Sequence, residues 1–358
     1  MKISIIGSRG YPYVYSGYET FVKELSERLV MKDIDVFIYC HSRLFKKRKK
    51  LINGINLIYT PSISNKFFSQ IFNSFFSILH ACFSNTDIIL VVNVANGPFG
   101  LLTKIFNKKT IINVDGLEWK RPKWKGIGSV YFKISAYFAT KLYDVIVTDS
   151  LEMKKVYLNK FKTESEVIAY GHNPSYKSKT QILKKFNLKK NDFYLIIGRM
   201  IPDNNADFIL SQFLKSSSKK KIVIIGDVPY IDSYSKHLKS FLDPRLVFTG
   251  YINCQNELED FYRNCFAYLH GHEFGGTNPT MINAIYYNSF IISLDTVFTR
   301  EMLRDVTNRK FFTKKNNQLK NLFNSKIYKT SKKNKLKKEY NWNNITNQYI
   351  NVFINLME

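Results

Sequence analysis

Short apolar segments alternate along the first half of the chain with longer segments in which apolar residues recur at helical spacing. The segment KISIIG (residues 2–7) precedes a loop and then YETFVKELSERLVMK, in which Phe21, Leu25 and Leu29 fall on one helical face. Apolar strands that alternate with helices predict βαβ units and a parallel sheet. The strands expected in this half are residues 2–7, 35–40, 55–60, 86–92, 110–114 and 144–150.

The alternation lapses in a polar, basic stretch at about residues 171–190 and then resumes. Such a stretch is typical of a domain boundary. We therefore predict an α/β protein with two doubly wound, Rossmann-like domains, and a ligand site in a cleft between them at the carboxyl ends of the strands. The strands expected in the second half are residues 193–199, 221–227, 245–250, 266–271 and 290–295, and a helix is expected over the last residues, 344–358.

The charge balance is strongly basic: 54 Lys and Arg against 28 Asp and Glu give a net charge of +26. Such a surface attracts polyanions, among them nucleic acid, anionic lipid and phosphorylated substrates. The chain is also rich in Lys, Asn, Ile and Phe, which an AT-rich coding sequence favours without any function. The sequence shows no nucleic-acid-binding module with interleaved basic and aromatic residues, so we expect no nucleic-acid partner.

The four cysteines are scattered without C-x-x-C spacing, which indicates neither a zinc knuckle nor a redox pair and suits a reducing cytoplasm. The first residues, MKISIIG, lead directly into a turn and lack the long apolar segment of a signal peptide. We find no apolar run long enough to span a bilayer.

The loop after the first strand contains candidate anion-binding features. Gly10 and Gly17 would let the backbone approach a ligand, and Ser16 and Glu19 have the spacing of a capping box at a helix start. The alternative is a tight turn with an ordinary cap. The loop matches neither a dinucleotide fingerprint nor a P-loop.

A second loop, HGHEFGGTNPT at residues 270–280, follows an expected strand and precedes an expected helix. Asn278 fits a helix N-cap and Pro279 fits the first helical position. Gly275 and Gly276 remove side chains at the turn, so the helix would direct N–H groups and its positive dipole end toward a diphosphate.

His272 and Glu273 lie in the same loop, where a sugar would bind, and a Gly-rich turn alone does not explain them. His270 and His272 have the spacing of an H-x-H metal pair, but no third ligand stands at recognisable spacing, so we expect no metal. The segment Asp33-Ile34-Asp35 resembles a metal-chelating D-x-D motif, yet we interpret it as a solvated turn before a strand.

Two further candidates follow expected strands. Asp115 and Glu118 come directly after residues 110–114, either at the edge of the cleft or as a helix cap with solvated charges. Arg199 ends the strand FYLIIGR and is a candidate phosphate clamp, because a guanidinium binds two phosphate oxygens at once; the alternative is a surface cation.

Together these segments resemble the retaining glycosyltransferases of family 4, which have the GT-B fold, and in particular a bacterial subgroup associated with rhamnosyl transfer. The resemblance is carried by GSRGYPYVYSGYETFVKELSERL, NVDGLEWKRPKW, GRMIPDNN and HGHEFGGTNP, in the expected order. It implies an acceptor-side domain at residues 1–172, a nucleotide-sugar-binding domain at 173–340, and a terminal helix at 341–358 that crosses back to the first domain.

The resemblance also implies roles for individual residues. Arg199 and the Gly276–Thr277 turn would bind the donor diphosphate, and Gly17 would approach it from the other domain. Fixed cations and helix N–H groups would stabilise the departing phosphate without a metal or another cofactor. The catalytic candidates are Asp115, His272 and Glu273; the donor-binding candidates are Gly17, Arg199, Gly275, Gly276, Thr277, Asn278 and Asn283.

Three positions depart from the family pattern. Many members have a lysine shortly after the equivalent of Arg199, where this chain has residues 202–205, PDNN. Asn283 occupies the place of a glutamate that holds the nucleotide ribose, and asparagine can still bond a hydroxyl without charge assistance. Asp115 corresponds to a histidine in many relatives.

The expected function is transfer of a sugar, from dTDP-rhamnose, to a lipid-linked (undecaprenyl diphosphate) saccharide in O-antigen or capsule synthesis. The alternatives are another donor, such as UDP-glucose or UDP-galactose, and a weakly active scaffold of an assembly complex. We expect a cytoplasmic protein, peripheral at the inner membrane face, because the apolar segment 67–83 and the basic run 46–50 could rest on anionic lipid. The alternatives for these two segments are a core helix and a solvated loop.

Overall fold

Parallel β-sheets form the centre of each of the two units into which the chain divides: residues 1–171 with 338–358 (unit 1) and residues 172–337 (unit 2). The structure is a computed structural model and describes residues 1–13, 17–63, 68–122, 124, 126–172, 181–228, 232–315, 317–326, 330, 333–334 and 336–358. The two doubly wound sheets confirm the predicted α/β, Rossmann-like fold class.

Unit 1 contains an eight-stranded sheet in the order β3-β4-β2-β1-β5-β6-β7-β8. All neighbouring strands are parallel except β3 and β4. β1, β2, β4, β5, β6 and β7 correspond to the six strands expected in this half. The strands are β1 (Lys2–Ile6), β2 (Asp35–His41), β3 (Leu51–Ile52), β4 (Ile55–Thr60), β5 (Ile88–Val92), β6 (Lys109–Val114), β7 (Val145–Thr148) and β8 (Glu166–Val167).

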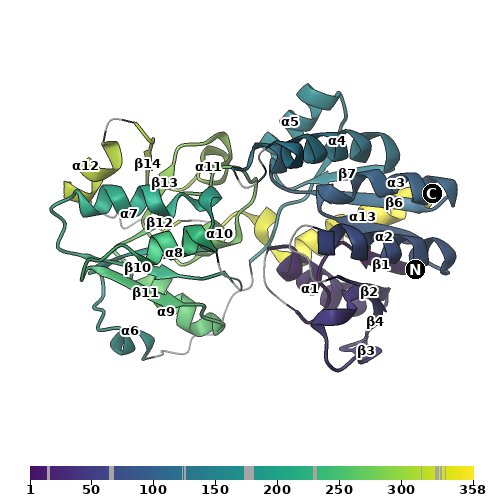
Figure 1. Ribbon diagram of the computed structural model, residues 1–358, viewed down its shortest axis with the longest axis horizontal. Coiled ribbons are helices and arrows are strands. Elements are labelled where there is room, and N and C mark those ends of the chain that lie inside the picture. Colours follow the sequence, from purple (N-terminus) through teal and green to yellow (C-terminus); the bar gives the residue numbers. More distant parts are fainter. Residues whose placement is uncertain are drawn as a thin grey trace. The chain divides into compact units, whose positions relative to one another are not determined.

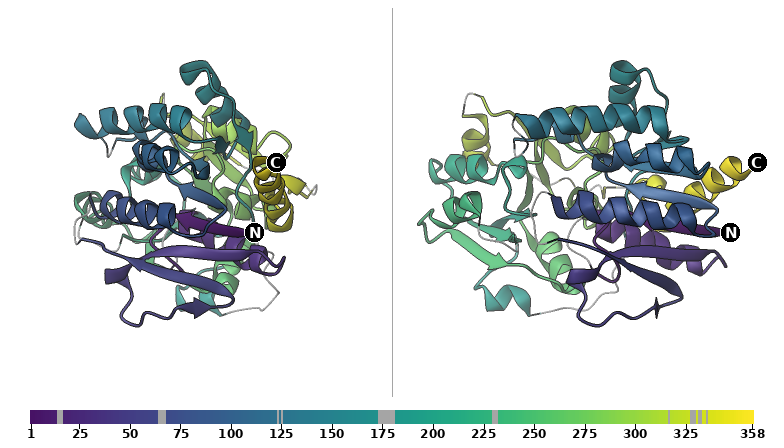
Figure 2. Two further views of the ribbon diagram at one scale, coloured as in Figure 1. Left: turned by 90° about the vertical axis from the view of Figure 1, so that its right-hand side faces the viewer. Right: turned by 45° about the vertical axis from the view of Figure 1, so that its right-hand side comes forward.

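Helices cover both faces of this sheet (Figure 1). α2, α3 and α4 lie on one face, and the terminal helix α13 lies on the other, as the left view of Figure 2 shows. The helices of unit 1 are α1 (Gly17–Val30), α2 (Phe68–Phe83), α3 (Gly100–Ile105), α4 (Ile127–Leu142), α5 (Leu151–Phe161) and α13 (Trp342–Met357).

The terminal helix α13 completes the core of unit 1 although it follows unit 2 in the sequence. The Phe21 ring on α1 lies 5.4 Å from the ring of Tyr349 and 6.4 Å from that of Trp342. Ile345 and Phe353 are fully buried in the same cluster. Apolar side chains on α13 therefore cover the face of unit 1 that α1 leaves open.

Unit 2 contains a parallel six-stranded sheet in the order β11-β10-β9-β12-β13-β14. Five strands match the expected segments. β14 lies near and the short helix α12 lies within a Lys- and Asn-rich stretch at residues 314–338, and neither corresponds to an expected element. The strands are β9 (Phe193–Ile197), β10 (Lys221–Ile225), β11 (Leu246–Gly250), β12 (Ala267–His270), β13 (Ile291–Leu294) and β14 (Arg309–Phe312). The helices are α6 (Ile182–Lys185), α7 (Ala206–Leu214), α8 (Ser233–Lys239), α9 (Gln255–Asn264), α10 (Pro279–Tyr286), α11 (Val297–Met302) and α12 (Gln318–Asn324).

Three further features of the structure bear on smaller predictions from the sequence. Asp33 and Asp35 are exposed in the turn that enters β2, as expected for a solvated turn. The four cysteines are free thiols. Within the described ranges, no helix combines the length and hydrophobicity that a membrane span requires.

Candidate functional site

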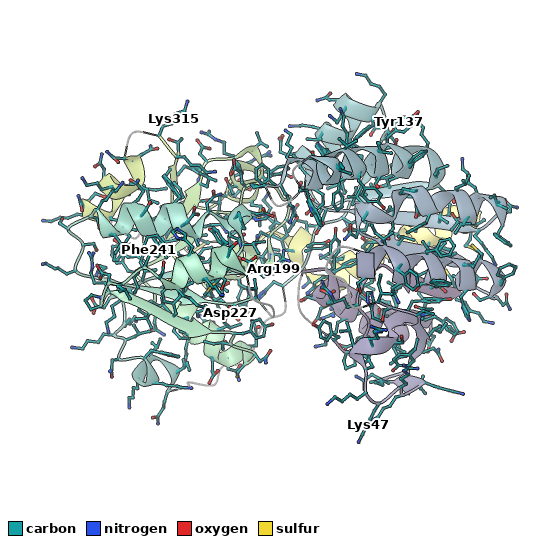
Figure 3. All side chains as sticks on the ribbon, viewed as in Figure 1. Lys47, Tyr137, Arg199, Asp227, Phe241 and Lys315 are labelled. Carbon is teal, nitrogen blue, oxygen red and sulfur yellow. The ribbon has the colours of Figure 1, made fainter. Side chains whose placement is uncertain are left out.

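The carboxyl ends of β9, β10 and β12 meet at one edge of the unit 2 sheet, because these strands are neighbours and parallel. Gly198 follows β9 and Gly226 follows β10, and their backbones are in close contact. A Cβ atom on Gly226, whose φ is +130°, would lie 2.0 Å from the Gly198 carbonyl oxygen. Two glycines thus draw the backbones together at the edge where Arg199 and Asp227 lie (Figure 3).

Arg199 is partly exposed at this edge. Its carbonyl oxygen accepts a hydrogen bond from Asn204 Nδ2 at 2.8 Å, which fixes the backbone of the loop. Among the residues that the structure describes, no side chain pairs with its guanidinium. The N–H donors of the Arg199 guanidinium group are therefore available to the oxygens of an anionic ligand.

The segment Asn204–Asn205 joins the loop after β9 to the loop after β12. Asn204 Oδ1 lies 2.9 Å from His272 Nδ1, and Asn205 Nδ2 donates to the Gly271 carbonyl at 2.8 Å and to Glu273 Oε2 at 3.2 Å. A Cβ atom on Gly271 would lie 2.2 Å from the Asn204 carbonyl oxygen. Asn204 and Asn205 thus hold His272 and Glu273 beside the Arg199 loop.

Glu273 also forms an ion pair with Lys314, whose Nζ lies 2.5 Å from Glu273 Oε2. Both side chains are partly exposed, so the pair adds little to stability, but it fixes the position of the carboxylate. Gly275 follows in the same turn, where a Cβ atom would lie 2.6 Å from His272 Nε2. Glycine at this position therefore leaves room for the imidazole.

Helix α10 begins as the sequence predicts. Asn278 is the N-cap and accepts hydrogen bonds from Thr280 N at 3.0 Å and Thr280 Oγ1 at 2.7 Å, while Pro279 occupies the first helical position. Gly276 and Thr277 are buried in the preceding turn. The positive end of the α10 dipole is thus placed at this Gly-rich turn, an arrangement that favours a bound anion.

His270 is a buried residue of strand β12. Its Nδ1 lies 3.1 Å from Tyr268 Oη, which is in turn 2.7 Å from Thr280 Oγ1. Burial lowers the pKa of His270 to about 3, so its ring is neutral near pH 7. No cluster of three or more His, Cys, Asp or Glu suited to a metal occurs in the part of the chain that the structure describes.

Asn283 lies on α10 and pairs with His172, with 2.6 Å between Asn283 Oδ1 and His172 Nδ1. The His172 ring also packs on Tyr286, with 4.0 Å between ring centroids. Burial lowers the pKa of His172, so the neutral ring donates its Nδ1–H to the amide oxygen. One acceptor position of Asn283 is therefore already used within unit 2.

In unit 1, Asp115 directly follows β6 and accepts hydrogen bonds from two tyrosines. Tyr18 donates to Asp115 Oδ1, and Tyr170 donates to Oδ2 at 3.0 Å. Burial raises the pKa of the Asp115 carboxyl group. Glu118 is buried and pairs with Arg121 at 2.9 Å. The alternative of a helix cap with solvated charges is therefore wrong for Glu118, whereas Asp115 is partly exposed and held by the two tyrosines.

The loop after β1 is described only in part. Gly17 begins α1, and a Cβ atom there would meet no described atom within 4 Å, so the space beside it is open. Ser16 lies outside the described residues, which leaves the predicted capping box without a geometry. Glu19 is buried and accepts from the backbone N–H of Arg9 at 3.4 Å.

The predicted residues thus form two groups. Gly17 and Asp115 belong to unit 1, whereas Arg199, His272, Glu273, the turn 275–278 and Asn283 belong to unit 2. Sequence reasoning missed the partners of these residues. Tyr18, Tyr170, His172 and Lys314 are each far from their partner in sequence, and no local spacing indicates them.

Two family models match this chain, one in each half. Residues 1–173 match a domain described as a domain of unknown function (DUF1972), and residues 178–344 match the domain described as glycosyl transferases group 1. No curated protein matches the chain significantly.

Solved structures share the fold at low identity. Sucrose-phosphate synthase from Thermosynechococcus elongatus is 14% identical, with a TM-score of 0.76 over 99% of this chain and 98% of its own. Anabaena HepE in complex with UDP is 13% identical, with a TM-score of 0.75 over 99% and 100%. The lipopolysaccharide outer core galactosyltransferase WaaB is 15% identical, with a TM-score of 0.57 over 90% and 88%. Residues 1–173 are therefore similar to the DUF1972 domain and residues 178–344 to the glycosyl transferases group 1 domain, and the chain has the GT-B fold.

Proposed function

We propose that the protein transfers a glycosyl residue from a nucleotide-sugar donor, with unit 2 binding the donor. The observation that carries the proposal is the Arg199 guanidinium, which is paired with no described side chain at the strand edge where the Gly-rich turn precedes α10. A guanidinium and a helix N-terminus together suit a diphosphate. HepE has been solved with UDP, with UDP and glucose, and with UDP-glucose, which supports a donor of this class.

The proposed reaction needs no metal and retains the anomeric configuration. The bond between the anomeric carbon and the diphosphate oxygen breaks as Arg199 and the turn before α10 stabilise the developing negative charge. The acceptor hydroxyl oxygen then bonds to the anomeric carbon from the leaving-group side. Its proton passes to the departing phosphate oxygen, so the step requires no protein base.

We further propose dTDP-rhamnose as the donor and a lipid-linked saccharide as the acceptor, at the inner face of the cytoplasmic membrane. The donor rests on the family resemblance carried by GSRGYPYVYSG and HGHEFGGTNP. The acceptor class gains support from WaaB, which acts on the lipopolysaccharide outer core and shares the fold. His272 and Glu273 would then contact the sugar, and Asp115 would lie on the acceptor side.

Two alternatives have specific support. A UDP-hexose donor is supported by the UDP and UDP-glucose complexes of HepE. A weakly active scaffold is supported by Asn283, because this amide replaces a carboxylate and its oxygen already accepts from His172 at 2.6 Å. In the first case only the donor changes, whereas in the second the turnover of every donor is weak or absent.

A panel of dTDP-rhamnose, UDP-glucose and UDP-galactose tests the proposal by thermal shift and by slow hydrolysis of the donor. A donor at 100 times its Kd should stabilise the protein by about 2.7 kcal/mol. We expect dTDP-rhamnose to give the largest shift and to be hydrolysed at the same rate with and without EDTA. A response to a UDP-hexose alone would support the first alternative, and no turnover of any donor would support the scaffold.

A further inference from the structure

Helix α2 packs on the unit 1 sheet with polar side chains inward beside apolar ones, of which Ile78 and Ala81 are fully buried. Asn73 and Ser77 are buried and hydrogen-bond to Thr60 Oγ1 at the end of β4, with Asn73 Nδ2 at 2.8 Å and Ser77 Oγ at 2.7 Å. The amide nitrogen of Asn73 and the hydroxyl group of Ser77 thus have hydrogen-bond partners on the buried side of the helix. Large apolar residues instead occupy the outer side of α2: Phe72, Phe75 and Phe83, the last of them 72% exposed.

Helix α4 likewise has a buried side and large apolar residues on its outer side. Its buried side includes the small residues Ser135, Ala136 and Ala139, which let the helix approach the rest of the unit. Its outer side carries large residues at helical spacing, although a surface helix ordinarily presents polar residues there. These residues are Ile127, which is 90% exposed, Val130, Ile134, Tyr137 and Phe138.

Helix α3 joins α2 and α4 into one surface. Leu101 and Ile105 are exposed on α3. The ring of Phe83 at the end of α2 lies 4.7 Å from that of Phe106 after α3, and Lys104 Nζ donates to the Lys141 carbonyl on α4 at 3.0 Å. The three helices lie side by side on one face of the sheet in Figures 1 and 2. We call the exposed side chains of α2, α3 and α4 the α2–α4 face.

The charge on this face has a single sign. None of the three helices contains an aspartate or a glutamate, whereas Lys104, Lys133 and Lys141 are exposed among the apolar side chains. Apolar and aromatic side chains interspersed with lysines fit the interface of a bilayer with negatively charged headgroups. A monomeric protein seldom exposes a continuous apolar surface of this kind without a partner.

We propose that the α2–α4 face binds the surface of an anionic lipid bilayer. A second copy of the chain fits less well, because a two-fold interface on this face would bury the lysines of both copies in one patch to which these three helices contribute no carboxylate. The net charge of +26 adds long-range attraction to anionic lipid. Binding through this face does not require sugar transfer, so it stands or falls separately from the proposed reaction.

The basic run 46–50 is a separate surface of unit 1. All five of its side chains are exposed. Figure 3 shows Lys47 and Tyr137 at opposite ends of the unit, with Lys47 beside β3 and Tyr137 on α4. Membrane binding through the α2–α4 face and membrane binding through this run therefore depend on different residues. One experiment can distinguish the two modes of binding.

Co-sedimentation of the full chain with vesicles of phosphatidylcholine, with and without phosphatidylglycerol, tests the proposal. The variant Leu101→Gln/Ile105→Gln/Ile127→Gln changes three exposed side chains and should leave the melting temperature unchanged. We expect it to bind vesicles that contain phosphatidylglycerol at least about tenfold more weakly than the wild type. The variant Lys104→Gln/Lys133→Gln/Lys141→Gln should also bind more weakly and show a shallower dependence on salt.

Two controls make the result specific to this face. Leu242→Gln removes a 95% exposed apolar side chain from unit 2 and should bind vesicles like the wild type. Neutralising residues 46–50 removes five cations elsewhere in unit 1 and should weaken binding less than the three substitutions on α3 and α4. Wild-type affinity in the triple glutamine variants would overturn the proposal. So would a dimer that these substitutions dissociate while vesicle binding persists, which would identify the face as an interface between two copies.

Discussion

Arg199 and Arg245 are two arginines of unit 2 that differ in whether another side chain pairs with the guanidinium group. Arg245 is held by Asp243 through two hydrogen bonds, Nε to Oδ1 at 2.9 Å and Nη2 to Oδ2 at 2.8 Å, whereas no described side chain pairs with Arg199. A cation that the protein keeps without a fixed partner at a strand edge is available to a ligand. One that is already paired contributes to the structure of its own loop.

We expect Arg199→Ala to weaken binding of the responding donor by roughly 10- to 100-fold, because a charged hydrogen bond to phosphate contributes about 1.5–3 kcal/mol. The free energy of unfolding of this variant should change by less than about 0.5 kcal/mol, since the substitution removes no intramolecular ion pair. Isothermal titration with the donor, together with urea unfolding, measures both effects. Arg245→Ala is the matched control and should lose stability but not donor affinity; unchanged donor binding in Arg199→Ala would remove its assigned role.

At the residue scale, the sequence predicts positions whose chemistry depends on local spacing. Asn278 and Pro279 stand at the start of a helix because their backbone preferences suit it, and the structure confirms both. The pairs His172–Asn283 and Glu273–Lys314 join residues 111 and 41 positions apart. Such pairs depend on how strands and helices pack, which no local pattern contains.

At the element scale, the side chain of Asn278 caps helix α10 and thereby orders its N-terminus. Asn278→Ala removes the acceptor for Thr280 N and should lower the free energy of unfolding by about 1 kcal/mol. If the turn before α10 binds the donor diphosphate, donor affinity should fall as well. Thermal unfolding and donor titration measure the two effects.

Ser150→Ala provides the comparison for that variant. Ser150 caps α5 in unit 1 by accepting from Met153 N at 3.2 Å, so its loss should lower stability by a similar amount. Donor affinity should stay at the wild-type value because unit 2 is unchanged. An equal loss of affinity in both cap variants would show that the effect is one of general stability rather than of the α10 terminus.

Helix α2 shows what a sequence pattern leaves open at this scale. Its phenylalanines predict a helix with an apolar side, and a core helix is the common interpretation of such a segment. The structure buries Ile78 and Ala81 as a core helix would, but it also turns Asn73 and Ser77 inward, because Thr60 at the end of β4 offers them hydrogen bonds. Which side of a helix faces the sheet depends on partners from another strand, so periodicity alone could not decide it.

At the scale of the whole molecule, each sheet has its own apolar cluster. The cluster of unit 1 includes residues from both ends of the chain, among them Ile3 and Phe353, whereas the cluster of unit 2 is built from residues 194–323. The repeated strands and helices predict both sheets, since the alternation is local. The return of α13 to unit 1 is implied by the family resemblance and not by any pattern within the helix.

Substitutions in the two clusters should therefore act on separate units. Phe353→Ala removes a fully buried ring that lies 6.1 Å from Tyr349 and should destabilise unit 1 by about 3–5 kcal/mol. Phe323→Ala is the matched change in unit 2, where the ring lies 4.9 Å from Tyr194. Hydrogen exchange followed by peptide mass spectrometry should show lost protection in β1, β2 and β5 for Phe353→Ala, and in β9 and β12 for Phe323→Ala. Loss of protection across both sheets from either substitution alone would mean that the units unfold as one cooperative body, and that α13 supports more than the unit it packs against.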